Sequence, residues 1–471
     1  MKYRYSDQEE IDLSVLHIRK RRRLDGTIGI QGSKNAVLPV MAASLLHRGI
    51  TVLSHVPAIE DVFCMMEILE WLGCSCRLEE HCLTIDASGA SMLPVPDTMA
   101  GRMRSSIMLL GPMLGRFGEA KTSRPGGCPI GKRPIGLHLA ALKKMGVRVR
   151  TEGEHISASV LKLTGARIHL DYPSVGATEN IIMAAAAAEG VTVLTGAARE
   201  PEIEILCRFL ASAGADISGT GSDRLMIRGG RTLHDTAFAI PGDRIVAGTY
   251  LGALLCAGGQ VLLREAPAEH MAECIRTARA AGAFVEVRPD GLFASIKGRP
   301  EAFSLVTGPY PGFPTDLQSV MLAAASVADG ESLIQENVFE NRFCAAKELQ
   351  KLGAHIIING RMARVTGRSS LCGGRVQAED LRGGAALAAA GLAADGPVRI
   401  CGYGHIRRGY EDICRDLQDA GAEIWLEEQT EDAGCDREEE ADGASGSRGS
   451  SAAAGNCGPV HEDYNHYGDG Q

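Results

Sequence analysis

The sequence predicts an α/β protein of two domains, each an inside-out barrel of three βαβαββ units of about 70 residues. One observation is a glycine that follows an amphipathic helix and recurs six times, with spacings of 73, 68, 68, 71 and 68 residues. Another is a glycine that ends an Ala/Leu-rich helix and recurs with spacings of 69, 72, 69, 71 and 66. The Ala/Leu-rich helices are also apolar on all sides, which is typical of buried helices. We therefore expect helices inside each domain and sheets outside.

Both glycine series mark element boundaries within each unit. Glycine after a helix takes the left-handed conformation without a Cβ clash, so the first series predicts helix C-termini. This series consists of Gly73, Gly146, Gly214, Gly282, Gly353 and Gly421. The second series consists of Gly49, Gly118, Gly190, Gly259, Gly330 and Gly396. Runs rich in β-formers follow these glycines, as at 192–194 and 355–358, and residues 363–365 alternate with the two-residue period of a strand.

Six units of this size divide naturally into two domains of three. We expect the first domain to cover residues 34–242, including a loop around Cys128, and the second to combine residues 12–33 with 243–427. Residues 428–471 are acidic and rich in Gly and Ser, so we expect a disordered tail that cannot bury a core.

The charge and the cysteines exclude several classes of protein. The net charge is −9, but the segment from Glu427 onward has 12 acidic and 2 basic residues, so the remainder is near neutral. No run of apolar residues is long enough to span a membrane, and the polar N-terminus does not resemble a signal peptide. The 14 cysteines are too dilute for a disulfide framework, which predicts reduced thiols and a cytoplasmic location. Cys74 and Cys76 have no matching second pair, so no metal site is expected.

Residues 19–23 form a basic run just before the first predicted strand. A nucleic-acid or membrane surface is one interpretation, and a solvated edge of an element is the other. Because no aromatic residues are interleaved with the basic ones, we favour the solvated edge and expect neither partner.

The most unusual loop surrounds Cys128, with glycines and prolines on both sides and four cations close in sequence. Positive charge favours the thiolate form of a cysteine and makes it reactive. A turn with a bystander cysteine is the alternative interpretation of the same pattern. The four cations are Lys121, Arg124, Lys132 and Arg133.

Cations also gather at the ends of predicted elements, where they could bind phosphate or carboxylate groups or could be ordinary surface charges. These residues are Lys34, Arg104, Arg133, Arg244, Arg342, Arg382 and Arg408. Residues 32–34 are not a phosphate-binding loop, because the four-residue spacer between glycines is missing. Asp316 comes just before an apolar helix, so it is either the N-cap of that helix or a general base.

Several sequence motifs together resemble those of the enolpyruvyl transferases, and most closely the branch that acts on UDP-N-acetylglucosamine. The match covers residues 24–426 in order, and the loop around Cys128 separates this branch from the shikimate-pathway enzymes. The family has two inside-out domains of three units each. The matching phrases are residues 32–36, 125–131, 174–178, 198–203, 313–316, 339–343 and 408–411.

The resemblance implies transfer of the enolpyruvyl group of phosphoenolpyruvate to the 3-hydroxyl of UDP-N-acetylglucosamine with release of phosphate, at the start of peptidoglycan synthesis. It implies these two small molecules as partners, with no cofactor and no metal. Cys128 is the implied proton donor and Asp316 the implied base, with Lys34 and Arg408 completing the catalytic set. The implied phosphoenolpyruvate contacts are Lys34, Asn35, Arg133, Arg382 and Arg408. The implied sugar-nucleotide contacts are Arg104, Arg133, Pro134, Ile135, Gly136, Leu137, Tyr172, Ser174, Val175, Asp316 and Val338.

Three positions depart from the family pattern. Gly136 and Val246 stand where the family usually has acidic residues, and Arg407 stands where an acidic residue precedes the final Arg-Gly-Tyr-Glu phrase. None of them is an implied proton donor, base or phosphoenolpyruvate contact. Two alternatives therefore stay open: a 5-enolpyruvylshikimate-3-phosphate synthase-like transferase, and a non-catalytic paralogue that binds the sugar nucleotide.

Overall fold

Five of the six repeats form a four-stranded sheet with one recurring strand order. The first strand of a unit pairs in parallel with the second, the second pairs antiparallel with the fourth, and the third lies at the far edge, as in β9-β10-β12-β11. The computed structural model describes residues 14–19, 23–127, 130–131 and 133–428, all within one compact unit. Cys128 and the predicted tail beyond residue 428 lie outside the described residues.

The first three units contain the following elements. The first has α1 (Lys34–Ala43), η1 (Ser44–Leu46), β3 (Ile50–Ser54), α2 (Glu60–Trp71), β4 (Ser75–Glu79), β5 (Cys82–Asp86) and the distant β13 (Thr236–Ala239). The second has α3 (Asp97–Ala100), η2 (Arg104–Leu109), α4 (Leu110–Phe117), β6 (Glu119–Ser123), α5 (Gly136–Lys144), β7 (Arg148–Glu152) and β8 (His155–Ser159). The third has β9 (Arg167–His169), α6 (Val175–Ala187), β10 (Val191–Thr195), α7 (Pro201–Ser212), β11 (Asp216–Ser218) and β12 (Arg224–Arg228).

The other three units use both ends of the described chain. The fourth has β2 (Leu24–Gly29), α8 (Arg244–Ala257), β14 (Gly259–Arg264), η3 (Ala268–His270), α9 (Ala272–Ala280), β15 (Phe284–Arg288) and β16 (Gly291–Ile296). The fifth has β17 (Ser304–Val306), η4 (Thr315–Leu317), α10 (Gln318–Ala325), β18 (Glu331–Gln335), α11 (Ala345–Lys351), β19 (His355–Asn359) and β20 (Met362–Thr366). The sixth has β21 (Gly374–Gln377), α12 (Leu381–Gly391), β22 (Val398–Cys401), α13 (Tyr403–Arg407), α14 (Ile413–Asp419), β23 (Ile424–Glu427) and the N-terminal β1 (Val15–Ile18).

The second unit departs from the predicted pattern, because its sheet has three described strands in the order β6-β8-β7. The segment beside β6, where a first strand was expected, contains Pro94 and Pro96, which have no N–H groups to donate to a sheet. Only the residue between them, Val95, donates a backbone hydrogen bond to Lys121, at 2.9 Å. Because the two prolines cannot donate hydrogen bonds to β6, this segment does not form the expected edge strand.

The first glycine series behaves as predicted. All six glycines follow a helix and have positive φ angles between +85° and +104°, a region that side chains with a Cβ rarely adopt. Each helix therefore ends at a fixed residue, and the chain turns there into an outer strand. The six are Gly73, Gly146, Gly214, Gly282, Gly353 and Gly421.

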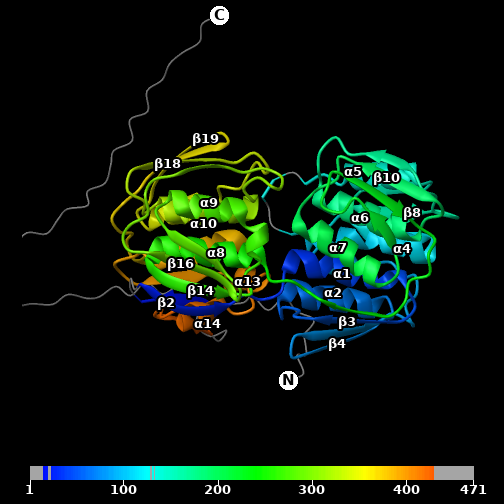
Figure 1. Ribbon diagram of the computed structural model, residues 1–471, viewed down its shortest axis with the longest axis horizontal. Coiled ribbons are helices and arrows are strands. Elements are labelled where there is room, and N and C mark those ends of the chain that lie inside the picture. The colour runs from blue at the N-terminus through cyan, green and yellow to red at the C-terminus, as the bar shows by residue number, and fades with distance from the viewer. Residues whose placement is uncertain (1–13, 20–22, 128–129, 132, 429–471) are drawn as a thin grey trace, which may run out of the picture. The chain divides into compact units, whose positions relative to one another are not determined.

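The interior consists of helices, as the apolar segments predicted. Every residue of α8, α10 and α12 is buried, and these three helices pack against one another. Close approach depends on glycine, because a Cβ on Gly248 of α8 would stand 2.3 Å from Leu317 and one on Gly252 would stand 2.7 Å from Val320. The outer strands alternate buried and exposed residues, as in β12 and β20, so each sheet presents one face to solvent (Figure 1).

The buried side chains form two separate hydrophobic cores. One is built from residues between Ala36 and Ile240, and the other from residues 16–30 together with 245–424. The chain crosses between the cores twice, and the two crossings pair with each other through Gly32 and Gly242. We infer that the cores correspond to domains over residues 34–242 and over 12–33 with 243–427. Within the described parts of the chain, no helix has the length and apolar character that a membrane crossing needs.

Candidate active site

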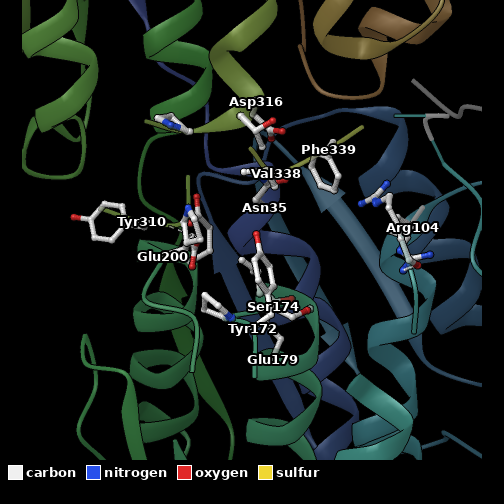
Figure 2. A pocket seen from close by; sticks show the side chains of 18 of the residues that line it. Asn35, Arg104, Tyr172, Ser174, Glu179, Glu200, Tyr310, Asp316, Val338 and Phe339 are labelled. Atoms are coloured by element: carbon white, nitrogen blue, oxygen red, sulfur yellow. Dashed lines mark hydrogen bonds between the residues drawn. The ribbon is translucent and has the colours of Figure 1, made fainter. Parts of the chain in front are cut away.

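A cavity of about 490 Å³ is lined by α1, η2, α5, α6 and α7 of the first core and by residues 308–316 and 338–339 of the second. Figure 2 shows Asp316 near Asn35, Val338 and Phe339 at one end of the cavity, and Glu179 at the other end. Ten of the residues predicted from the sequence line it. They are Asn35, Arg104, Arg133, Pro134, Leu137, Tyr172, Ser174, Val175, Asp316 and Val338.

The carboxylate of Asp316 is held by two arginines. Arg342 donates from Nη2 to Oδ1 at 2.9 Å, and Arg382 donates from Nη2 to Oδ2 at 3.1 Å. Asp316 lies in the middle of η4, and neither η4 nor α10 has a side-chain cap. The interpretation of Asp316 as an N-cap is therefore wrong, because the 3₁₀ turn moves the residue inside the turn and two guanidinium groups take its oxygens.

The charges around Asp316 keep it ionised. Burial alone would raise the pKa of this carboxyl, but Arg382 and Arg342 more than offset burial and hold the pKa well below its usual range. The ammonium of Lys34 acts in the same direction, so it belongs to the same electrostatic environment. The side chain is still 27% exposed, so the carboxylate can reach a substrate in the cavity.

Arg382 is fixed from several sides. It is the second residue of α12, and its backbone N–H donates to the capping carboxylate of Asp380 at 2.9 Å. Its guanidinium also donates to the hydroxyl of Tyr410 at 3.4 Å, and that hydroxyl shares a hydrogen bond of 2.7 Å with Thr249. Tyr410 is fully buried, so it provides a rigid support for the arginine that holds Asp316.

Lys34 and Arg408 meet at one carboxylate, that of Asp61. Lys34 begins α1, and its Nζ lies 2.7 Å from Oδ2 of Asp61. Arg408 follows α13, and its Nε lies 3.0 Å from Oδ1 of the same residue. The two cations come from different hydrophobic cores, so the predicted phosphoenolpyruvate contacts converge across them.

The crossing segments place Lys34 at this point. The backbone N–H of Lys34 donates to Oδ2 of Asp243 at 3.0 Å, while Oδ1 of Asp243 caps α8 through Ile245 at 2.7 Å. Asp243 itself donates its backbone N–H to the carbonyl of Gln31 at 2.8 Å. One buried carboxylate thereby ties the start of α1 to the start of α8.

Helix α6 directs its N-terminus to the cavity, which Ser174 and Val175 line. The first N–H groups of a helix have no partners within the helix and attract anions. Arg104 lies near this region and donates to the backbone carbonyl of Arg133. Burial and the neighbouring charge of Arg133 lower the pKa of Arg104 to about 10, so it remains a cation at neutral pH. These groups suit a phosphate-bearing ligand.

Glu336 organises the other side of the Asp316 end. One oxygen accepts the backbone N–H groups of Val338 and Phe339 at 2.8 and 2.9 Å, and the other accepts the hydroxyl of Thr315 at 3.0 Å. The ring of Phe339 lies 5.8 Å from the guanidinium of Arg133. Glu336 therefore fixes the loop that carries Val338 and the turn that carries Asp316.

The far end of the cavity is acidic. Glu179 is fully buried, and among the described residues neither of its carboxylate oxygens has a hydrogen-bond partner, nor does Oε2 of Glu200. Burial raises the pKa of both carboxyls. The charges of Glu202 and Glu200 raise the pKa of Glu179 further, and the charge of Glu202 also raises the pKa of Glu200. Glu202 differs, because it forms a two-pronged ion pair with Arg244 at 3.0 and 3.1 Å. No described group of three His, Cys, Asp or Glu side chains could hold a metal ion.

Cys128 lies outside the described residues, but the loop on both sides of it is held closely. A Cβ on Gly126 would stand 1.6 Å from the carbonyl oxygen of Gly101, and a Cβ on Gly131 would stand 2.3 Å from the carboxylate of Glu340. The carbonyl of Ile130 accepts the backbone N–H of Asn341 at 3.1 Å. The glycines of this phrase are thus needed for close contacts with residues of both cores.

Five predicted contacts do not line the cavity: Lys34, Arg382 and Arg408, described above, and Ile135 and Gly136. The three departures from the family pattern lie outside the lining as well. Ile135 and Gly136 begin α5. Gly136 is exposed, and an added Cβ there would meet nothing within 4 Å. Val246 is fully buried in the second core, and the guanidinium of Arg407 lies 5.6 Å from the ring of Tyr403. Gly136 and Arg407 are both exposed and leave room for an acidic residue, whereas Val246 is buried among apolar side chains.

Sequence reasoning missed most of the buried acids that organise the site. Asp61 follows Glu60 at the start of α2, where acidic residues are common, so nothing in the pattern set it apart. Glu200 and Glu202 lie within a phrase that carried the family resemblance, and that was the available signal. Glu179 and Glu336 gave no signal beyond being acids beside apolar segments.

Comparison with known proteins identifies the family. The family model of EPSP synthase, 3-phosphoshikimate 1-carboxyvinyltransferase, matches residues 18–417. A UDP-N-acetylglucosamine 1-carboxyvinyltransferase 2 of Caldanaerobacter subterraneus is 43% identical over 404 residues, covering 86% of this chain and 97% of that protein. The UDP-N-acetylglucosamine 1-carboxyvinyltransferase of Nitratidesulfovibrio vulgaris is 43% identical over 403 residues, covering 85% and 96%.

Solved structures show the same fold. The enolpyruvyl transferase NikO from Streptomyces tendae has a TM-score of 0.80 at 24% identity, covering 89% of this chain and all of that one. EPSP synthase from Acinetobacter baumannii has a TM-score of 0.69 at 20% identity, covering 88% of this chain and all of that one. The predicted two-domain α/β fold is thereby confirmed, and the sequence matches place the chain more narrowly. The chain belongs to the EPSP synthase family and, within it, to the UDP-N-acetylglucosamine 1-carboxyvinyltransferases.

Proposed function

We propose that this chain transfers the carboxyvinyl group of phosphoenolpyruvate to the 3-hydroxyl group of UDP-N-acetylglucosamine and releases phosphate. The observation that carries the proposal is the ionised Asp316 at one end of the cavity, within the electrostatic reach of Lys34. Relatives that are 43% identical bear the name of this activity. We place the reaction in the cytoplasm, at the entry to peptidoglycan synthesis and hence to growth of the cell wall.

Phosphoenolpyruvate carries a phosphate and a carboxylate, and the Asp316 end supplies matching cations. Lys34 and Arg408 both point to Asp61, so their charges already meet at one place. Arg133 lines the cavity, and Arg382 is buried beside Asp316. Charge-assisted hydrogen bonds to such groups are about twice as strong as neutral ones. We assign the substrate's anionic groups to these cations, with Asn35 beside them.

The sugar nucleotide has its own set of groups. The N-terminus of α6, at Ser174 and Val175, suits the diphosphate, with Arg104 as a nearby cation. Tyr172 and Val338 line the same cavity and supply apolar contact. Asp316 then faces the sugar hydroxyl that reacts. The proposed arrangement places the uridine near residues 133–137.

The proposed reaction needs proton transfers and charge stabilisation. The thiol of Cys128 gives a proton to the methylene carbon of phosphoenolpyruvate, which leaves an oxocarbenium-like centre at the adjacent carbon. The sugar hydroxyl attacks that carbon, and Asp316 takes the hydroxyl proton as general base. In the second half, the new methyl group loses a proton, the carbon–carbon double bond re-forms, and the bond to phosphate breaks. The cations stabilise the negative charge on the departing phosphate.

The decisive test is phosphate release from phosphoenolpyruvate with two alternative acceptors. We expect release with UDP-N-acetylglucosamine and none with shikimate 3-phosphate. Release only with shikimate 3-phosphate would assign the chain to the other branch of the family. Binding of UDP-N-acetylglucosamine without any release would support a non-catalytic paralogue instead.

A second test asks whether Cys128 is an acid. Serine has a much higher pKa than a thiol, so Cys128→Ser should lose turnover by about 100-fold or more while UDP-N-acetylglucosamine binding is retained. Cys128→Asp should keep some turnover, with its optimum at lower pH, where more of the carboxyl is protonated. The epoxide fosfomycin alkylates the corresponding cysteine of the family, so it should inactivate the wild type and spare the Asp variant. Near-normal turnover of Cys128→Ser would place the proton donor elsewhere.

A further inference from the structure

Asp61 occupies an unusual position for a residue that touches no proposed substrate. It is the second residue of α2, and its side chain is 7% exposed. Each of its two carboxylate oxygens binds one cation: Oδ2 binds the ammonium of Lys34 at 2.7 Å, and Oδ1 binds Nε of Arg408 at 3.0 Å. A single carboxylate therefore joins the two cations that we assign to phosphoenolpyruvate.

This arrangement offsets the repulsion between two neighbouring cations. Lys34 and Arg408 are both cations, their side chains are 10% and 17% exposed, and little water is available to screen their repulsion. An anion between them offsets this repulsion, and Asp61 contacts both cations. Asp61 supplies that anion before any substrate is bound.

The charge state of Asp61 fits this role. Burial alone would raise the pKa of its carboxyl, but the charges of Lys34 and Arg408 more than offset burial and lower the pKa. Asp61 also lies in the first turn of α2, where the helix dipole favours negative charge. The carboxylate is thus ionised throughout the neutral pH range.

We propose that Asp61 is a positioning residue for the transfer reaction, and that it holds Lys34 and Arg408 together so that the phosphoenolpyruvate site is formed before the substrate arrives. This inference rests on the proposed function for the identity of the anion. An ammonium has three N–H groups and a guanidinium has four besides Nε–H, which is more than one carboxylate oxygen can accept. Asp61 accepts one from each.

The alternative role for Asp61 is that of a competitor, an internal anion that phosphoenolpyruvate must displace. The two roles predict opposite effects of removing the charge. A positioning carboxylate improves phosphoenolpyruvate binding, so its loss weakens binding. A competing carboxylate opposes binding, so its loss strengthens it.

The experiment compares Asp61→Asn with Asp61→Glu. Asn keeps the size of Asp but loses the charge, so kcat/KM for phosphoenolpyruvate should fall by about 10- to 100-fold, the order that misplacing a binding group costs. Most of the loss should appear in KM, and the Kd for UDP-N-acetylglucosamine should stay unchanged. Asp61→Glu keeps the charge and should recover part of the loss. Glu70→Gln, an exposed substitution on the same helix, is the matched control and should behave as wild type.

Measurements of anion binding without turnover distinguish a failure of the positioning role from a failure of the proposed function. Titration calorimetry with phosphoenolpyruvate and with inorganic phosphate measures the anion site without turnover. If the wild type binds phosphoenolpyruvate but releases no phosphate, and Asp61→Asn binds it more weakly, the positioning role stands and the proposed function fails.

Four results would overturn the positioning role. The first is unchanged or tighter phosphoenolpyruvate binding by Asp61→Asn. The second is an equal loss of UDP-N-acetylglucosamine binding, which would indicate general structural damage. The third is Asp61→Glu being no better than Asn, and the fourth is a wild type that binds neither phosphoenolpyruvate nor phosphate.

Discussion

The two ends of the cavity hold buried carboxylates under opposite conditions. Asp316 lines one end, and Asp61 lies outside the lining; each binds two cations, and the pKa of each is lowered despite burial. At the other end, within the part of the chain that the structure describes, both carboxylate oxygens of Glu179 and one of Glu200 have no hydrogen-bond partner, and the pKa of each group is raised. Burial acts in the same direction at both ends, so the arginines and lysine decide which carboxylates stay charged. The cations thus keep the carboxylates of the first end ionised, whereas burial favours the protonated form at the second.

This difference has a consequence for ligands. An anion such as phosphoenolpyruvate is attracted to the cations near the Asp316 end, which are Lys34, Arg382 and Arg408. The Glu179 end offers no such attraction and favours neutral groups or bound water. The difference in charge between the two ends thus favours one orientation of an extended substrate, with its anionic part at the Asp316 end. The following predictions test how each end depends on its charges.

The largest effect is expected from Asp316→Asn. Asn cannot take the hydroxyl proton, so turnover should fall by at least about 100-fold, the usual contribution of a general base. The variant also leaves Arg342 and Arg382 without their shared carboxylate, so some loss of stability accompanies the loss of activity. Phosphate release per folded molecule is the measurement, with melting followed in parallel.

Asp329→Asn is the matched control for Asp316→Asn, because Asp329 pairs with Arg299 at the surface and its side chain is 79% exposed. It should leave both turnover and melting unchanged. Normal turnover by folded Asp316→Asn would remove the general-base role and require another proton acceptor at this end of the cavity.

A second prediction concerns Glu202, a carboxylate near the acidic end that forms an ion pair with Arg244. Glu202 and Arg244 are 3% and 9% exposed, and their ion pair joins α7 of the first core to α8 of the second. Arg244→Met should destabilise the protein by about 3–5 kcal/mol, because it leaves Glu202 buried beside two other acids without its partner. Urea unfolding measures the loss.

The double variant Glu202→Gln, Arg244→Met tests the cause. It removes both charges and should recover most of the stability that Arg244→Met loses. If the double variant is no more stable than Arg244→Met, the loss reflects packing around the arginine stem, and the ion pair is not what separates Glu202 from its neighbours.

A third prediction uses the pH dependence of stability. The folded protein holds Glu179 with a raised pKa, so between the unfolded and folded pKa values the folded state binds more protons. The wild type should therefore lose stability as pH rises above about 4.5, at no more than about 1.4 kcal/mol per pH unit from this group. Glu179→Gln removes the titration, so its stability advantage over wild type should grow from pH 5 to pH 8.

Urea midpoints at several pH values give the measurement for Glu179→Gln. Glu189→Gln is the control, because Glu189 lies at the surface with a side chain that is 61% exposed. It should give a curve parallel to that of the wild type. A constant difference between Glu179→Gln and wild type across this range would mean that Glu179 is ionised in the folded state and has an unrecognised partner.

The fold was more predictable from the sequence than the site. Glycines such as Gly73 and Gly353 must take positive φ wherever the repeat recurs, so their spacing specified the units. The lost edge strand followed from Pro94 and Pro96, a local signal that the repeat count concealed. Residues such as Asp316 were found through the resemblance to a family, and the structure corrected the capping alternative.

The partners of these residues could not be read in the same way. Asp61 meets Arg408 across 347 positions of the chain, and Arg244 meets Glu202 across 42. Such pairs depend on how two domains fold around each other, which no local pattern encodes. An acidic residue at the start of a helix looks the same whether it faces water or holds two cations.

The smallest effect is expected at Gly136, which stands where the family usually has an acidic residue. Gly136 is the first residue of α5, and an added Cβ would meet nothing within 4 Å, so Gly136→Asp should fold normally. A carboxylate at a helix start gains about 0.3–1 kcal/mol from the dipole. Because it is exposed and three residues from Arg133, it should stay ionised, unlike Glu179.

If residues 133–137 contact the uridine as proposed, the Gly136→Asp carboxylate can accept a hydrogen bond from the base. One such bond is worth about 0.5–1.5 kcal/mol, so the Kd for UDP-N-acetylglucosamine should fall by about two- to tenfold. Gly136→Asn has the same size without the charge and should give a smaller gain. Calorimetric titration of wild type, Gly136→Asp and Gly136→Asn is the measurement. Equal affinities in all three would place the uridine away from α5 and leave Gly136 as a neutral substitution at an exposed helix start.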